Sequence, residues 1–143
     1  MREALTRTEA ETEALAAELA ATFRGGEIVL LSGELGAGKT VFVRGLARGV
    51  GADAQEVASP TFVLLTSYPG RLTLYHADLY RLAGNGDDLE LGLEELPGSL
   101  GVLAVEWAER LSPGTWDAAR AVRVTLEHAG DDARRIRIEG TAA

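Results

Sequence analysis

A glycine-rich segment of eight residues constrains the fold of this chain more than any other feature. Residues 33–40 read Gly-Glu-Leu-Gly-Ala-Gly-Lys-Thr, which matches the pattern G-x-x-x-x-G-K-[ST]. An apolar run at residues 27–32 precedes the segment, and residues 41–48 carry apolar side chains at helical spacing. Where a strand, a glycine-rich loop and a helix follow one another in this order, the backbone N–H groups of the loop and the N-terminus of the helix surround a bound phosphate. The segment therefore predicts a site for a nucleoside triphosphate.

The lysine of this loop, Lys39, is the only lysine of the chain, and every other strongly basic residue is an arginine. A compact ammonium fits among crowded phosphate oxygens better than a planar guanidinium does. We therefore expect Lys39 to reach the β- and γ-phosphates and the Thr40 hydroxyl to ligate Mg²⁺. The residues of this segment expected to contact the nucleotide are Glu34, Leu35, Gly36, Ala37, Gly38, Lys39, Thr40 and Val41.

The composition narrows the class of protein. A chain of 143 residues with 46% hydrophobic content suits one domain over 1–143 with a substantial core. It has no cysteine, which excludes disulfides and thiolate metal sites. The net charge of −8 disfavours nucleic-acid binding by the bulk surface. No apolar stretch reaches the length of a membrane span, and the charged N-terminal segment is unlike a signal peptide, so we expect a cytoplasmic protein.

Apolar periodicity predicts helices and strands in an order typical of a P-loop protein. The expected elements are a helix over 8–23 with a Thr8–Glu11 capping pair, the P-loop strand and helix, strands over 63–68 and 71–78, a short helix over 88–96, a strand over 101–106, and strands over 121–126 and 135–138. Hairpins add antiparallel strands to a parallel core. The prediction is an α/β, single-domain P-loop NTPase-like three-layer fold with a mixed sheet, and the nucleotide at the carboxyl ends of the parallel strands.

Two carboxylates at strand ends are candidates for the acidic group that a P-loop ATPase needs beside Mg²⁺ or the attacking water. Glu106 ends an apolar strand, and Asp78 ends an alternating one, so these two and Lys39 are the expected catalytic residues. The sequence leaves open which carboxylate contacts the metal directly. His76 shares a strand face with Asp78, where it is either a partner of that carboxylate or a core histidine. Trp107 is expected to pack in the core or beside a base or partner.

A turn after the P-loop helix offers two more hydroxyls. Ser59-Pro60-Thr61 lies where GTPases carry a loop that senses the γ-phosphate. We therefore expect Ser59 and Thr61 to contact the nucleotide or its Mg²⁺, with an ordinary proline-stiffened turn as the alternative.

Four segments in this order resemble the bacterial TsaE family. They are residues 33–40, Ser-Pro-Thr-Phe at 59–62, His-Ala-Asp-Leu-Tyr-Arg at 76–81 and Val-Glu-Trp at 105–107. The resemblance implies Mg²⁺-dependent ATP hydrolysis that is slow in the isolated protein. It also implies work with the TsaB and TsaD proteins in making N6-threonylcarbamoyladenosine at position 37 of tRNA, which the chain would meet only through that complex.

Residue roles follow from the same resemblance. Thr40 and Glu106 fall on the metal side, and Asp78 belongs to the active-site face, where it is a further candidate metal ligand. The adenine pocket is implied near the N-terminal segment and the C-terminal hairpin, which makes Thr8, Glu9 and Arg134 candidates for nucleotide contact. Val41 stands where the family often has a second hydroxyl, so one contact to the α-phosphate is in doubt.

Two other functions remain open from the residues alone. A GTP-dependent switch protein would generally read guanine with an Asn-Lys-x-Asp loop, which this sequence lacks. A small-molecule kinase would need an arginine-rich lid, and none is evident between residues 82 and 118. The partner interface, its stoichiometry and the oligomeric state are not predicted.

Overall fold

The computed structural model describes residues 2–34, 36–57, 65–80, 92–111 and 121–140. Three predicted nucleotide contacts, Leu35, Ser59 and Thr61, lie outside these residues, as does the first part of the helix expected over 88–96. The extent of a single domain over 1–143 therefore stays a prediction. Neither described helix has the length and apolar character that a membrane crossing requires.

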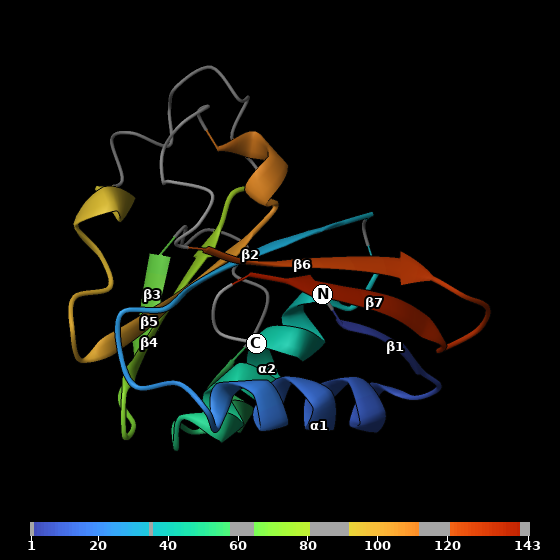
Figure 1. The fold of residues 1–143 in the computed structure, drawn as a ribbon, viewed down its shortest axis with the longest axis horizontal. Coiled ribbons are helices and arrows are strands. Elements are labelled where there is room, and N and C mark those ends of the chain that lie inside the picture. Colours follow the sequence, from blue (N-terminus) through green and yellow to red (C-terminus); the bar gives the residue numbers. More distant parts are fainter. Residues whose placement is uncertain (1, 35, 58–64, 81–91, 112–120, 141–143) are drawn as a thin grey trace.

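Seven strands form one mixed sheet in the order β1-β7-β6-β2-β5-β4-β3 (Figure 1). They are β1 (Arg2–Thr6), β2 (Ile28–Gly33), β3 (Leu65–Tyr68), β4 (Thr73–Asp78), β5 (Gly101–Glu106), β6 (Ala121–His128) and β7 (Arg134–Glu139). The central strands β6, β2, β5 and β4 run parallel, and antiparallel pairings add β7 and β1 at one edge and β3 at the other. The predicted mixed α/β sheet is confirmed.

Helices cover one face of this sheet, and short 3-10 turns pack on the other. α1 (Glu9–Ala20) and α2 (Lys39–Gly49) lie together on the lower side in Figure 1. η3 (Leu93–Glu95) and η4 (Ala108–Arg110) lie on the upper side, and η1 (Ala54–Glu56) follows α2. Leu93 and Trp107 join an apolar cluster with Leu103 and Val105 on that upper face. The arrangement gives the three layers that the sequence predicts.

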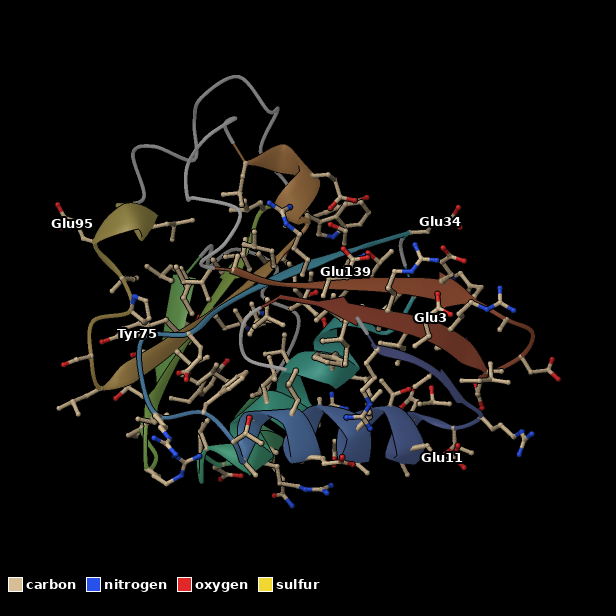
Figure 2. All side chains as sticks on the ribbon, in the orientation of Figure 1. Glu3, Glu11, Glu34, Tyr75, Glu95 and Glu139 are labelled. Atoms are coloured by element: carbon tan, nitrogen blue, oxygen red, sulfur yellow. The ribbon has the colours of Figure 1, made fainter. Side chains whose placement is uncertain are left out.

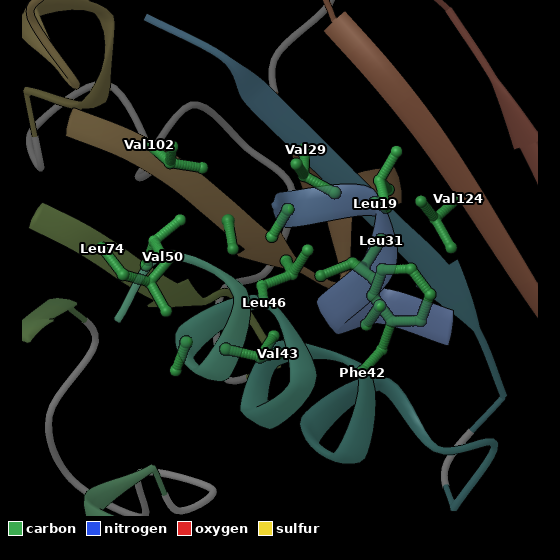
Figure 3. Packing of buried hydrophobic residues seen from close by; sticks show 14 of the residues in the cluster. Leu19, Val29, Leu31, Phe42, Val43, Leu46, Val50, Leu74, Val102 and Val124 are labelled. Atoms are coloured by element: carbon green, nitrogen blue, oxygen red, sulfur yellow. The ribbon is translucent and has the colours of Figure 1, made fainter. Parts of the chain in front are cut away.

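The larger core lies between the two helices and the sheet (Figure 3). Phe42 and Leu46 of α2 are fully buried there against Val29 and Leu31 of β2. The two helices pack closely because α2 presents glycine to α1: a Cβ at Gly45 would lie 2.2 Å from the Glu13 carbonyl oxygen. This packing fixes both β2 and α2, and so fixes the two ends of the loop that joins them.

The start of α1 confirms the predicted capping pair with one difference in detail. Thr8 is the N-cap, and its hydroxyl accepts from the Glu11 N–H at 3.1 Å. The Glu11 carboxylate accepts from the N–H of Arg7, one residue before the cap, at 2.9 Å. The helix ends at Ala20, three residues before the predicted end at Phe23, because the chain turns there and Phe23 N–H donates to the Ala20 carbonyl.

The strand β1 is an element that the sequence pattern does not predict. Its residues are mostly exposed, and only Ala4 and Thr6 contribute to the interior. Its stability comes from pairing with β7, where Glu3 lies opposite Arg137 and accepts a hydrogen bond from it at 3.1 Å. A strand held by a distant partner has little local signal, since strand propensity depends on what lies beside it.

Candidate functional site

The predicted phosphate-binding loop joins the carboxyl end of β2 to the N-terminus of α2. Gly33 passes so close to β6 that a Cβ there would lie 2.5 Å from the Leu126 carbonyl oxygen. Gly38 is the N-cap of α2 with a left-handed φ of 100°, and it gives the first turn no side-chain hydrogen bond. A helix start without such a cap offers its first N–H donors and its positive dipole end to an anion.

Lys39 is buried in this loop. Its Nζ donates to the carbonyl oxygens of Gly33 at 2.5 Å and Glu34 at 2.9 Å. The same ammonium lies 3.9 Å from the centre of the Trp107 ring, a distance at which a cation is attracted to the aromatic face. Burial lowers the pKa of Lys39, and the nearby carboxylates of Glu109, Glu106 and Asp78 oppose that shift.

Thr40 brings the loop onto the first predicted carboxylate. Its hydroxyl donates to Glu106, with distances of 3.0 Å to Oε1 and 3.1 Å to Oε2. Glu106 is the last residue of β5, lies opposite Leu31 of β2, and is almost completely buried. Two segments far apart in the sequence thus meet through one hydroxyl and one carboxylate.

The second predicted carboxylate lies on the neighbouring strand. Asp78 ends β4 directly opposite Glu106 in the parallel register, and its Oδ1 accepts from the Tyr80 N–H at 3.0 Å. Burial raises the pKa of Asp78, and the charge of Glu106 adds to the rise. The Tyr80 hydrogen bond and the charge of Lys39 act in the opposite direction, as a protonated His76 would. The site therefore places two carboxylates side by side with a cation close to both.

His76 contacts Glu106 rather than Asp78. The ring Nε2 lies 2.5 Å from Glu106 Oε2, and the side chain is fully buried. The strand period correctly places His76 on the same face as Asp78, but the contact depends on how β4 pairs with β5. That register is not visible in the sequence. Of the two alternatives, the buried position agrees with a core histidine, and the expected partner Asp78 is replaced by Glu106.

Arg134 of β7 holds the backbone of the loop. Its Nε donates to the Ala37 carbonyl at 3.1 Å, and its Nη2 donates to the Gly36 carbonyl at 3.1 Å. Its Nη1 donates to the carbonyls of Asp131 and Ala133 in the turn that precedes β7. Contact with an adenine stays a prediction for this residue, while its contacts tie the phosphate loop to the C-terminal hairpin.

Similar proteins agree on one family. Residues 6–136 match the family described as threonylcarbamoyl adenosine biosynthesis protein TsaE. This chain belongs to the TsaE family. It is 40% identical to the tRNA threonylcarbamoyladenosine biosynthesis protein TsaE of Bacillus subtilis over 127 residues, which cover 88% of this chain and 77% of that protein. It is 35% identical to the protein of the same name from Aquifex aeolicus over 140 residues, 96% of each chain.

Two further comparisons extend this result. The TsaE protein of Treponema pallidum is 52% identical over 87 residues, which cover 61% of this chain and 64% of that protein. A crystal structure of Bacillus subtilis YdiB superposes with a TM-score of 0.72 at 34% identity, covering 96% of this chain and 83% of that one. The resemblance to the TsaE family and the α/β fold are both confirmed.

The remaining predicted residues of this TsaE-family chain are placed as follows. Glu34 contributes its backbone oxygen to Lys39, whereas its side chain points away from the molecule at the end of β2 (Figure 2). Val41 is half-buried in the first turn of α2, and Glu9 is exposed at the start of α1. The position of Trp107 is the one that the sequence predicts least well. Its backbone takes a left-handed φ of 59° directly after β5. Its ring lies over the Lys39 ammonium, and the centres of the Trp107 and Tyr80 rings are 5.0 Å apart.

Proposed function

We propose that this protein binds ATP together with Mg²⁺, hydrolyses it, and uses the hydrolysis in synthesis of threonylcarbamoyladenosine in tRNA. The observation that carries the proposal is the hydrogen bond between Thr40 and Glu106. It joins the residue after the loop lysine to a buried carboxylate at the end of a parallel strand, which is where P-loop enzymes hold the metal of a metal–nucleotide complex. Membership of the TsaE family supplies the pathway.

The donors around the loop fit a triphosphate. The N-terminus of α2, which has no side-chain cap, and the Lys39 ammonium are two positive groups. They lie beside Gly38, which has no side chain that could obstruct a ligand. Gly38, the N-cap of α2, is one of the residues expected to contact the nucleotide. Its left-handed φ of 100° strains any other residue, so the cradle depends on glycine there.

The oxygen donors fit Mg²⁺. Thr40 and Glu106 supply hard oxygen donors, with Asp78 next to Glu106, and among the described residues no three His, Asp or Glu side chains form a metal cluster of their own. Mg²⁺ in nucleotide sites is held by one or two protein oxygens together with phosphate oxygens and water. When bound, the ion would neutralise charge that develops on the phosphate oxygens.

The two carboxylates have different roles in the proposed reaction. We assign Glu106 to the metal side because it contacts Thr40, and Asp78 to the attacking water because it lies beside Glu106 without taking part in that contact. A raised pKa makes Asp78 a stronger base, which suits a group that accepts a proton from water.

The readout of hydrolysis is assigned to partner proteins, TsaB and TsaD, by the family resemblance. The net charge of −8 makes direct capture of tRNA unfavourable, since phosphate neutralisation needs clustered basic side chains. The chemistry of the tRNA base is therefore placed on the partners, and the ATPase on this chain.

The test is calorimetry with ATP and GTP, with and without Mg²⁺, combined with a phosphate-release assay. The proposal expects ATP to bind more tightly than GTP, Mg²⁺ to strengthen binding, and slow phosphate release. Lys39→Ala should remove tight binding while leaving the fold intact by circular dichroism. Equal affinity for GTP would favour the switch protein, and ATP binding without any phosphate release would overturn the ATPase.

A further inference from the structure

Three side chains from three elements form a line of hydrogen bonds at the end of the sheet. Thr40 of α2 donates to Glu106 of β5, and Glu106 Oε2 also lies 2.5 Å from His76 Nε2 of β4. The His76–Glu106 contact is shielded from water, because Glu106 is 2% exposed and His76 is fully buried, whereas Thr40 is half-buried. The proposed reaction uses Thr40 and Glu106 and leaves His76 without a role.

The hydrogen-bond partners of Glu106 and His76 are the basis for assigning the protons of these contacts. We assign Glu106 as the ionised carboxylate, which only accepts hydrogen bonds, and we assign the proton of this contact to His76 Nε2. The other ring nitrogen, Nδ1, is buried with no hydrogen-bond partner among the described residues. A neutral ring with its proton on Nε2 leaves Nδ1 as an acceptor, whereas a proton on Nδ1 would be a buried donor without a partner, which costs more.

This line of bonds fixes the direction of one hydroxyl. A threonine hydroxyl has one proton and two lone pairs, and when the proton points to Glu106 both lone pairs face away from that carboxylate. Ligation of a cation by Thr40 needs a lone pair to face the ion. A carboxylate held by His76 keeps its acceptor oxygens in place for the Thr40 proton, as outer hydrogen bonds do for ligands in other metal sites.

A purely structural role for His76 explains the burial poorly. Leucine would fill a similar volume in this sheet face without burying a ring nitrogen that has no partner within the described part of the chain. The polar contact to Glu106 is what distinguishes histidine from an apolar residue at this position.

We propose that His76 is a positioning residue which, through Glu106, orients the Thr40 hydroxyl for Mg²⁺. The inference rests on the proposed function, since it concerns the metal of the ATP complex. It assigns to His76 a contribution to Mg²⁺ dependence and none to ATP binding in the absence of metal.

The first test needs neither nucleotide nor metal. The chain has two histidines, His76 and His128, so ¹⁵N-labelled imidazole spectra of the full chain are simple, and His128→Asn assigns the signals. The expected result is His76 with its proton on Nε2, shifted by Glu106→Gln. A proton on Nδ1, or a His76 signal that ignores Glu106→Gln, would overturn the inference.

The second test measures the Mg²⁺ concentration that gives half of the full gain in ATP affinity. His76→Leu removes the donor at similar volume and should raise that concentration roughly ten- to hundredfold, the usual effect of losing an outer partner of a metal ligand. His76→Gln carries an amide N–H that can reach Glu106 and should restore most of the loss. ATP affinity in EDTA should be the same for all three proteins.

The matched control is Leu74→Val, two residues earlier on the same face of β4 and equally buried. It loosens the core beside His76 without touching Glu106, so it should lower the unfolding temperature and leave the Mg²⁺ dependence unchanged. If His76→Leu and Leu74→Val both show the Mg²⁺ dependence of the parent, this inference alone is wrong. If the parent does not bind ATP at all, the proposed function fails together with it.

Discussion

Lys39 shows how one charge is accommodated inside a small protein. Its ammonium has two carbonyl oxygens and the face of Trp107 as near neighbours, with three carboxylates close enough to oppose the effect of burial on its pKa. Carbonyl oxygens attract the ammonium but carry no full charge, so a phosphate can compete for it. The residue is held in the loop and remains available to an anion.

Replacement of Lys39 by arginine should therefore fail although the charge is kept. The space between Gly33 O, Glu34 O and the Trp107 ring fits a point-like ammonium, and a planar guanidinium needs another geometry. We expect Lys39→Arg to lose at least about tenfold in ATP affinity, because a hydrogen bond to a charged group contributes roughly 1.5–3 kcal/mol. Calorimetry measures the affinity, and ATP affinity near that of the parent would contradict the geometric argument.

Variants of the two carboxylates should lower the rate of ATP hydrolysis more than the affinity for ATP, whereas variants of Lys39 should lower the affinity. Glu106→Gln and Asp78→Asn keep the shape of each side chain and remove the charge to which the proposed function assigns contact with metal or water. We expect phosphate release to fall on the order of 10²-fold or more, typical of losing a positioned catalytic group, and ATP affinity to fall less. Single-turnover assays separate the two effects. Unchanged turnover in both variants would remove these residues from the mechanism.

The same Asp78→Asn variant should be more stable than the parent when no metal is present. Burial raises the pKa of Asp78 above its ordinary value of 3.8, so the charged form is disfavoured in the folded protein. The stability contributed by this group is complete below pH 3.8 and is lost as the pH rises through the raised value. At pH 7.5 in EDTA the asparagine should unfold at a higher temperature while still accepting from Tyr80 N–H, and the difference should vanish toward pH 3.8. A lower unfolding temperature at pH 7.5 would show that the charge is stabilising.

At the scale of elements, Arg71 joins the ends of both helices to the β3–β4 turn. Its Nη1 donates to the Phe23 carbonyl at 2.8 Å, and its Nη2 donates to those of Ala20 and Gly49 at 3.2 Å each. Ala20 and Gly49 are the last residues of α1 and α2, where carbonyls lack partners within the helix and a positive charge is favourable.

Arg71→Met keeps the apolar stem and removes these bonds. We expect it to lower the free energy of unfolding by about 1–2 kcal/mol, since charged donors and two helix ends are lost together. Arg48→Met is the matched control, because Arg48 makes an exposed ion pair with Glu13 at 2.7 Å and such pairs contribute less than about 1 kcal/mol. Urea unfolding compares the two, and equal losses would show that the helix-end contacts do not stabilise the fold.

The elements that the sequence predicts are those whose signal is local. The strand and helix on either side of the loop at 33–40, the buried strand over 101–106 and the C-terminal hairpin each carry their own apolar period or turn residues, and all are present. β1 depends on β7, and the bond from His76 to Glu106 depends on the register of β4 against β5. Pairings between distant strands are tertiary information, so neither could be read from one segment.

At the scale of the whole molecule, the residues of the site lie together at the carboxyl ends of the parallel strands. The parallel strands β2, β4 and β5 end at Gly33, Asp78 and Glu106, and α2 starts from the same edge at Lys39. Ligands of open α/β sheets bind outside the carboxyl ends of such strands. Both strand-end carboxylates lie near the loop because a parallel sheet brings the ends of its strands together whatever their order in the chain, while their roles stay predictions.

The association with partner proteins should depend on the nucleotide. A partner can respond to hydrolysis only if it binds the ATP and ADP forms with different affinity. The turn at Ser59 and Thr61, outside the described residues, is the predicted sensor of the γ-phosphate. We expect the TsaB–TsaD pair to bind this chain at least about tenfold more tightly with a non-hydrolysable ATP analogue than with ADP, a coupling of about 1.4 kcal/mol. We also expect the isolated chain to turn over slowly.

Calorimetry or sedimentation with purified TsaB–TsaD measures this difference. Lys39→Ala is the control: without tight nucleotide binding its affinity for the pair should be the same with either nucleotide, while Arg48→Met, on the exposed surface of α2, should behave as the parent. If the parent binds the TsaB–TsaD pair equally tightly with both nucleotides, or if the isolated chain turns over quickly, then ATP hydrolysis is not coupled to these partners. In that case the Thr40–Glu106 contact would still describe an ATPase, but one whose hydrolysis is read out in another way.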